Sequence, residues 1–239
     1  TKTGAASSTL ADVQVDLSTT TPQTSSTGAY TIKSIPLTQG TKPASVPNYK
    51  QAIVCTSNIT ASQCTTLQSE AVTLQGRIAK NGQDLLSWIN LGTLHKAAGD
   101  YQAAITYWQY MADMYPTNPV AFGDLGDMYT NFVKDYPKAE ANYLAAIKAY
   151  PIDPAPYKNL FVLYTTTSYT GGAGAAEAIL KKGIEANPKA VDLEVTLARY
   201  YKTSGRAADA KAQFDAAIKN AQAQGNTALA SQIQEEAIQ

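Results

Sequence analysis

The feature that most constrains this chain is a residue pattern that recurs four times between about Trp88 and Gln222. Each unit opens with a large residue, continues with leucine, a small residue and an aromatic, and then carries alanines around a second large apolar residue. Successive units are 34, 35 and 37 residues apart. The marker positions are Trp88, Leu91, Gly92, His95, Ala104, Trp108 and Pro116; Phe122, Leu125, Gly126, Tyr129, Ala139, Tyr143, Ala146 and Pro151; Tyr157, Leu160, Phe161, Tyr164, Ala176, Leu180 and Pro188; and Glu194, Leu197, Ala198, Tyr201, Ala210, Phe214 and Ala217.

The spacing within each unit predicts two amphipathic helices that cross closely. Apolar positions at i, i+3, i+4 and i+7 lie on one helical face. Gly92, Gly126 and Ala198 are small where the second helix should cross, whereas Phe161 is large there and predicts looser or shifted packing in the third unit. One such hairpin cannot bury its own apolar face, so the units should stack into a solenoid. We expect Trp88, Trp108, Phe122, Tyr143, Tyr157 and Phe214 to be buried between the helices.

Turn residues separate the helices at regular places. Gly99-Asp100 and Ser204-Gly205 are turn dipeptides within their units. The third unit has a longer turn, Thr165 to Gly174, which is rich in Thr and Gly. Asn-Pro and Asp-Pro pairs lie at the unit junctions, where the residue before proline avoids the helical region and ends a helix. The pairs are Asn118-Pro119, Asp153-Pro154 and Asn187-Pro188.

This pattern resembles the tetratricopeptide-repeat proteins of bacterial envelopes, over about Leu67 to Gln239. The resemblance implies an all-α, right-handed superhelix of helix pairs and a role in protein contacts. We expect the solenoid over residues 65–225, with an N-terminal capping helix whose N-cap is Ser62 or Thr65 and a C-terminal capping helix over 226–239. Leu67, Glu70, Ala71, Leu74 and Ile78 should share one face of the first cap.

Residues 1–48 differ in composition and form an extended N-terminal arm in this interpretation. Ser/Thr tracts such as Ser18–Thr21 suggest a stalk, but two stretches alternate apolar residues as strands do. Two isolated strands are not stable alone in water, so the arm needs a surface, on its own solenoid or on another copy. The apolar arm residues are Val13, Val15, Leu17, Tyr30, Ile32, Ile35 and Leu37.

The two cysteines, Cys55 and Cys64, lie within a predicted loop over residues 49–64. Their short spacing and even number favour a disulfide in an oxidising compartment, and two unrelated buried thiols are the alternative. Asn58-Ile59-Thr60 between them is a glycosylation sequon, so Asn58 is a candidate glycan site. A zinc site is not expected, because two Cys and the single His95 cannot complete a usual ligand set, and His95 occupies a core position. These features favour an extracellular or cell-surface location, with the periplasm as the alternative.

Composition excludes several classes of function. The formal net charge is zero and charged residues make up only 16% of the chain, so no basic stripe exists to attract nucleic acid. No apolar run is long enough to span a membrane. We find no nucleophile motif, metal set or phosphate-binding loop, and Gly171–Gly174 lacks the preceding strand that such a loop needs. The sequence therefore predicts a non-enzymatic protein without a cofactor.

Two hypotheses for function remain. In the first, the protein is an extracellular structural subunit that assembles with other copies, in a filament if the arm docks head-to-tail. In the second, it is a secreted or periplasmic adaptor that binds a partner peptide in its concave groove. The low charge and the secreted signature favour the first. The predicted groove residues are mostly neutral and lack a carboxylate-clamping cation cluster: Ile89, Thr93, Lys96, Asp127, Thr130, Asn131, Lys158, Val162, Thr165, Arg199 and Lys202.

Overall fold

The computed structural model describes residues 40, 43, 45–166, 168–170, 172 and 174–238. The arm residues from Val13 to Leu37, and with them both predicted strands, lie outside this range. Within it the chain is all-α and has no strand. The helices are α1 (Ala61–Lys80), α2 (Leu85–Ala98), α3 (Tyr101–Met114), α4 (Pro119–Met128), the π-helix η1 (Tyr129–Val133), α5 (Tyr136–Ala149), α6 (Ala155–Thr166), α7 (Ala176–Ala186), α8 (Val191–Thr203), α9 (Ala207–Ala223) and α10 (Thr227–Ile238).

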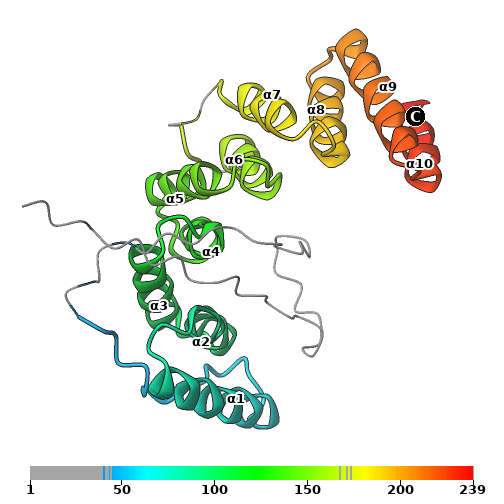
Figure 1. Ribbon diagram of the computed structural model, residues 1–239. Helices are drawn as coiled ribbons and strands as arrows, with labels where there is room; N and C mark the ends of the chain where they lie inside the picture. The colour runs from blue at the N-terminus through cyan, green and yellow to red at the C-terminus, as the bar shows by residue number, and fades with distance from the viewer. Residues whose placement is uncertain are drawn as a thin grey trace, which may run out of the picture.

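The helices pack as sequential antiparallel pairs, as the repeat predicts. The pairs are α2 with α3, α4 with α5, α6 with α7, and α8 with α9, while α1 packs on α2 and α10 packs on α9. The pairs follow one another along an arc, with α2, α4 and α6 toward its inner side and α3, α5 and α7 toward its outer side (Figure 1). In this arrangement each pair covers the apolar face of its neighbours, which is the stabilising principle of a solenoid.

Polar side chains set where several helices begin. The α1 helix is capped by Thr60, whose hydroxyl accepts a hydrogen bond from the Gln63 amide at 3.3 Å, while the Gln63 side chain accepts one from the Thr60 amide at 3.0 Å. This reciprocal capping box makes Thr60 the N-cap, so the expectation of Ser62 or Thr65 was wrong. Aspartates at the N-cap start three further helices by accepting a backbone N–H, namely Asp84 for α2, Asp100 for α3 and Asp135 for α5.

Small residues let the paired helices approach closely. A Cβ atom on Gly92 would lie 2.5 Å from the Trp108 indole, and one on Gly126 would lie 2.4 Å from the Tyr143 ring. These distances are shorter than real contacts allow, so the leucine-glycine signature reports a true crossing point in the first two units. The aromatic that faces each glycine is almost completely buried, with Trp108 and Tyr143 each 1% exposed.

The expected aromatic core is present with one correction. Trp88, Trp108, Tyr143, Tyr157 and Phe214 are at most 2% exposed. Phe122 was also expected between the helices, and that expectation was wrong: Phe122 is only partly buried. Its ring lines a surface depression together with Pro116 and is therefore not enclosed.

The second unit is one residue longer than the first, and a π-helix takes up the difference. Residues Tyr129–Val133 form η1 at the end of α4, and Lys134 then adopts the left-handed conformation with φ 62°. A π-helical turn holds one more residue than an α-helical turn, so the insertion needs no extra loop. It leaves Phe132 and Val133 exposed, at 41% and 46%.

The third unit supplies its small residue from the other helix. A Cβ on Gly183 of α7 would lie 2.8 Å from the Tyr157 ring, so α7 approaches α6 at Gly183 rather than at Phe161. Phe161 instead turns its ring edge-on to Tyr200 of α8, with 5.5 Å between centroids. The predicted shift in packing is therefore a change of crossing point.

The long turn of the third unit is tied back to the second. Glu140 of α5 accepts hydrogen bonds from the Tyr164 hydroxyl at 2.6 Å and the Tyr169 hydroxyl at 2.5 Å. Burial and the Glu140 carboxylate raise the pKa of Tyr164, so its hydroxyl remains a donor across the physiological pH range.

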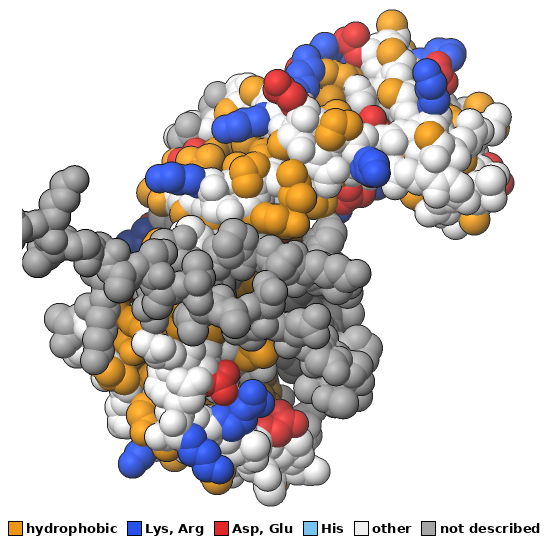
Figure 2. All heavy atoms as spheres, viewed as in Figure 1, with side chains coloured by type: hydrophobic (Ala, Val, Ile, Leu, Met, Phe, Trp, Pro, Cys, Tyr) orange, Lys and Arg blue, Asp and Glu red, His pale blue; other side chains and the backbone are white. Residues whose placement is uncertain are grey.

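Charges of both signs are scattered among uncharged side chains over the described surface in the view of Figure 2, without a patch of one sign. Among the described residues, no helix is both long and apolar enough to cross a bilayer.

Candidate partner-binding surfaces

The predicted groove residues fall into three groups of exposure. Ile89, Asp127 and Thr130 are buried, at 6–8% exposed, and so belong mainly to the core. Thr93, Lys96 and Lys158 are partly buried. Those that offer most of their surface to a partner are Asn131, Val162, Thr165, Arg199 and Lys202.

Three of the predicted groove cations bind neighbouring helices of the same chain. The Lys158 ammonium lies 3.1 Å from the Asp192 carboxylate, which links α6 to α8. Arg199 binds Glu236 through two nitrogens at 2.5 and 2.7 Å, and Lys202 donates to the Glu236 carbonyl at 3.2 Å, so both link α8 to α10. The Lys158 and Arg199 pairs are 32–59% exposed, and such pairs contribute under about 1 kcal/mol each. These cations connect adjacent repeats and do not converge on a carboxylate site.

A buried polar network joins the second and third units around Asp127. Its carboxylate accepts a hydrogen bond from the Tyr143 hydroxyl at 2.8 Å and from the Asn159 amide at 3.2 Å. The Thr130 hydroxyl donates to the Tyr143 oxygen at 3.3 Å. Burial, with the Asp127 carboxylate in second place, raises the pKa of Tyr143. Asp127 and Thr130 therefore position α4, α5 and α6. Because each is only 6% exposed, little of either side chain is left to contact a partner in the groove.

Asp124 was not among the predicted groove residues, yet it is the most perturbed carboxyl group of the described structure. Burial and the nearby Asp127 carboxylate raise its pKa to about 7, although Lys96 acts in the opposite direction. Asp124 and Asp127 are three residues apart on α4, a spacing that places both on one helical face. This spacing was visible in the sequence. At neutral pH the Asp124 carboxyl either accepts or donates a hydrogen bond, because both protonation states are populated.

Lys96 lies between aromatic rings of two units. Its ammonium is 5.9 Å from the Trp108 ring and 5.5 Å from the Phe132 ring, distances at which cation–π attraction operates. Phe132 in turn contacts Tyr101, with 4.5 Å between ring centroids. The π-helix η1 thus brings Phe132 onto the first unit, and Tyr101 and Phe132 together expose aromatic surface there.

The described part of the N-terminal segment lies along the outer side of α3 and reaches α1, as the blue trace in Figure 1 shows. Ile53 is its main anchor and is only 2% exposed. Two glutamine side chains of α1 donate to the segment's backbone: Gln68 to the Ile53 carbonyl at 3.0 Å and Gln75 to the Gln51 carbonyl at 3.1 Å. The Thr56 amide donates to the Ala98 carbonyl at 3.0 Å. An extended stretch of this chain is therefore held on the surface of the first repeat.

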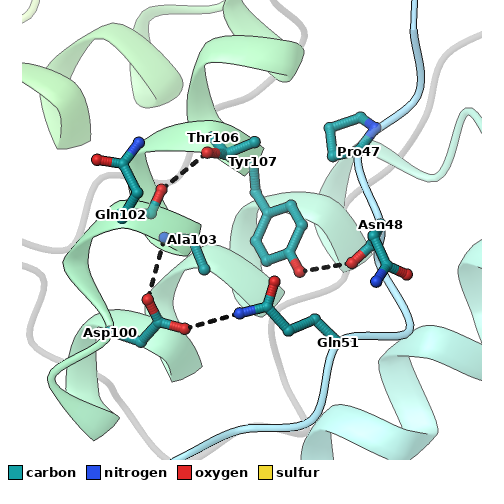
Figure 3. Close-up of a pocket in the computed structure, with 8 residues that line it drawn as sticks. All are labelled: Pro47, Asn48, Gln51, Asp100, Gln102, Ala103, Thr106 and Tyr107. Carbon is teal, nitrogen blue, oxygen red and sulfur yellow. Dashed lines mark hydrogen bonds between the residues drawn. The ribbon is translucent and has the colours of Figure 1, made fainter.

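A small polar depression of about 140 Å³ lies between this segment and α3 (Figure 3). Asp100 accepts hydrogen bonds there from the Gln51 amide at 3.1 Å and from the Ala103 backbone at 3.2 Å, and the Tyr107 hydroxyl donates to the Asn48 carbonyl at 3.0 Å. Burial, supported by the Asp100 charge, raises the pKa of Tyr107 to about 12. Because these polar groups form hydrogen bonds with one another, the depression marks a seam, that is, the line of contact between the N-terminal segment and α3.

His95 reaches the same seam from inside the first hairpin. It is fully buried, as predicted for a core residue; its Nδ1 lies 3.0 Å from the Asp100 carboxylate and its ring contacts Tyr107 edge-on. Its role is to fill the core and to link the end of α2 to the start of α3.

A disulfide joins Cys55 to Cys64, with 5.9 Å between the Cα atoms, and so ties the segment to the first turns of α1. Asn58 lies exposed in the turn that the Ile59 amide closes on the Thr56 carbonyl at 3.0 Å. The sequon threonine, Thr60, is the α1 N-cap described above.

No protein-family profile matches the chain, and no curated protein matches it. Among solved structures, MamA has a TM-score of 0.51 at 17% identity, over 65% of this chain and 89% of MamA. Yeast Tom70 has a TM-score of 0.53 at 17% identity, over 69% of this chain and 35% of Tom70. YrrB, described as a TPR protein with an unusual peptide-binding site, has a TM-score of 0.47 at 16% identity, over 69% of this chain and 90% of YrrB.

Similarity at this level of identity concerns the fold. The four hairpins with their marker positions, and the similarity in fold to MamA and Tom70, lead to one conclusion: the chain has a tetratricopeptide-repeat fold.

Proposed function

We propose that this protein is a non-enzymatic structural subunit outside the cytoplasm, which assembles with other copies by docking its N-terminal arm on a neighbouring solenoid. The supporting observation is the extended segment on the first repeat, where Ile53 is buried and Gln68 and Gln75 bind backbone carbonyls. This surface holds an extended stretch of its own chain through a side-chain anchor and amide donors. An arm from another copy would therefore dock on a different part of the solenoid, through the same kind of contacts.

Two further observations fit this role. The Cys55–Cys64 disulfide favours an oxidising compartment, where an extracellular subunit would be found. The formal net charge is zero, so copies do not repel one another through net charge. A head-to-tail contact between unlike surfaces does not close on itself, so it would extend into a filament.

The test compares the full chain with a variant in which Val13, Val15, Leu17, Tyr30 and Ile32 are changed to serine. We expect polymers from the full chain in light scattering and negative-stain microscopy, and monomers from the variant. The matched control changes five Ser or Thr residues within 18–27 to alanine and should still polymerise. A full chain that stays monomeric up to high concentration contradicts the proposal, provided that circular dichroism shows intact helices.

The second candidate is an adaptor that binds a partner peptide on the inner face, and one observation favours it. Asp124 makes no hydrogen bond or ion pair within the described residues, and its pKa is raised to about 7 beside Asp127. A partner that presents an ammonium or amide donor would stabilise the ionised Asp124 carboxylate, which burial and Asp127 disfavour. Lys158 and Arg199 each form an ion pair within the chain, with Asp192 and Glu236 respectively. This argues against a partner whose C-terminal carboxylate would be bound by these two cations.

The adaptor is tested by peptide selection on the full chain at pH 8. Selected peptides should be enriched in Lys, Arg or Gln, and Asp124→Asn should weaken their binding about tenfold, as expected for loss of a charge-assisted contact. Glu235→Gln, on exposed α10, is the control and should bind as the parent chain does. Peptides that bind both variants equally would exclude Asp124 from recognition.

A further inference from the structure

An apolar depression of about 410 Å³ lies where α3 ends and α4 begins. Helix and junction residues form most of it: the buried Ala112, the exposed Asp113 and Pro116, and the partly buried Phe122. The N-terminal segment contributes Gly40 and Pro43 to its rim. The depression thus combines uncovered apolar surface with the point where the described chain begins.

The repeat itself indicates that something should cover Phe122. Phe122 occupies the position that Trp88 occupies one unit earlier. Trp88 is fully buried, and the Tyr49 ring of the N-terminal segment packs edge-on against it with 5.7 Å between centroids. Phe122 has no such cover among the described residues. The segment therefore covers the opening aromatic of the first unit, and the equivalent place in the second unit lies at Gly40.

Gly40 is held firmly at this place. Its amide donates to the Met114 carbonyl at 2.8 Å, and a Cβ atom on Gly40 would lie only 2.3 Å from the Asp113 carbonyl oxygen. The backbone therefore passes α3 at a distance that only glycine permits. The residue that precedes Gly40 along the chain by three is Leu37, and three residues span at most about 10–11 Å. Because Gly40 and Phe122 line the same depression, we infer that this leucine can reach Phe122.

We propose that the segment Ile35–Leu37 of the same chain binds this depression, with the Leu37 side chain covering Phe122. Pro36 keeps such a segment extended and removes one amide, so recognition through the Leu37 side chain suits it better than a backbone ladder. This goes beyond the proposed assembly, because it divides the arm. The residues from Ile35 onward bind in cis, and only the earlier apolar stretches remain to reach another copy.

Cysteine cross-linking tests the proposal in the full chain. Leu37→Cys is combined with Asp113→Cys on the wall of the depression; the native cysteines are already paired and do not compete. Mild oxidation of a dilute sample should give an intramolecular disulfide in most molecules, found by peptide mapping, because a disulfide needs Cα atoms about 4.4–6.8 Å apart. The control pairs Leu37→Cys with Lys219→Cys, an exposed position on α9, and should cross-link at least about tenfold more slowly.

Two results overturn the proposal. Cross-linking at Asp113 no faster than at Lys219 shows that Leu37 does not bind there, and an intermolecular product on a non-reducing gel shows that another copy does. A second readout avoids cysteines: Leu37→Asp should raise the hydrogen-exchange rate of the Gly40 amide at least about tenfold, and an unchanged rate contradicts the proposal. Neither readout depends on polymer formation, so failure here leaves the assembly test separate.

Discussion

The Tyr49 ring packs edge-on against the Trp88 indole, with 5.7 Å between their centroids. Tyr49 comes from the N-terminal segment, and Trp88 opens the first repeat. Trp88 also contacts Tyr107 and Tyr110 of α3, at 5.7 and 4.8 Å. The contact therefore makes the segment part of the first repeat's aromatic core and explains why a stretch without secondary structure is held in place.

Removing the Tyr49 ring should weaken the first repeat. We expect Tyr49→Ala to lower the free energy of unfolding by about 1–2 kcal/mol, because an aromatic pair and part of a buried ring are lost. Chemical denaturation measures the change. Lys219→Ala on exposed α9 should stay within about 0.5 kcal/mol of the parent. Equal stability of the Tyr49 variant would show that the segment does not support the core.

Two helical glycines should respond in opposite directions to the same substitution. Gly92→Ala places a methyl group against the Trp108 indole and should cost about 1–3 kcal/mol as overpacking. Gly76→Ala on α1 meets open space and should stabilise by about 0.5–1 kcal/mol, because alanine favours a helix more than glycine does. Thermal unfolding of both variants checks the pair. A stabilised Gly92 variant would contradict the close crossing of α2 and α3.

Asp124 should make stability fall as the pH rises. Its pKa is about 7 in the folded chain and near 3.8 when unfolded, so between these values the folded state binds more protons. The free energy of unfolding therefore decreases by up to about 1.4 kcal/mol per pH unit in this window, and the loss persists above pH 7. Asp124→Asn should flatten the profile between pH 4 and 7 and unfold less readily at pH 8. Glu235→Gln is the control, and a parallel profile for Asp124→Asn would disprove the assignment.

The disulfide should stabilise the chain by constraining its unfolded state. Replacing both Cys55 and Cys64 by serine should lower the free energy of unfolding by about 2–3 kcal/mol, the chain-entropy value for so short a loop. Reductant should destabilise the parent chain by a similar amount and leave the double variant unchanged. Two free thiols in native secreted material, found by non-reducing mass spectrometry, would exclude the bond.

Asn58 should carry a glycan when the chain is secreted by a host that modifies sequons, because it is exposed in a turn. Intact-mass measurement should show a glycan mass that Asn58→Gln removes. Asn58→Gln keeps the Thr60 cap, so its stability should match the unglycosylated parent, whereas Thr60→Ala should cost about 0.5–2 kcal/mol from loss of the cap. An unmodified Asn58 in such a host would remove this site.

The sequence predicts the hairpins well because their signal is local. The spacing from Leu91-Gly92 to Trp108 reports which faces meet, and the structure confirms that contact. Partners of charged side chains could not be predicted in this way. Lys158 and Asp192 are 34 residues apart and meet only because one repeat stacks on the next, so a residue assigned to a groove became a link between repeats.

Asp124 was missed and Phe122 was misjudged, for related reasons. The raised pKa of Asp124 depends on how deeply the inner face buries α4, and no residue pattern along one helix reports that depth. Phe122 matches the pattern of a buried aromatic, but the cover for that position comes from outside the repeat, as Tyr49 provides for Trp88. A contact between a repeat and the N-terminal segment has no sequence signature, because the segment does not share the repeated pattern.

The disulfide also has a mechanical consequence. If the arm carries tension between copies, the load enters the solenoid through the segment that runs from Gly40 to Cys55. From there the Cys55–Cys64 bond transmits it covalently to the start of α1, in parallel with the hydrogen bonds from Gln68 and Gln75. Residues 56–63, including the turn at Asn58, are bypassed and carry little force. Tension would thus be borne by the disulfide and α1 rather than by the exposed turn.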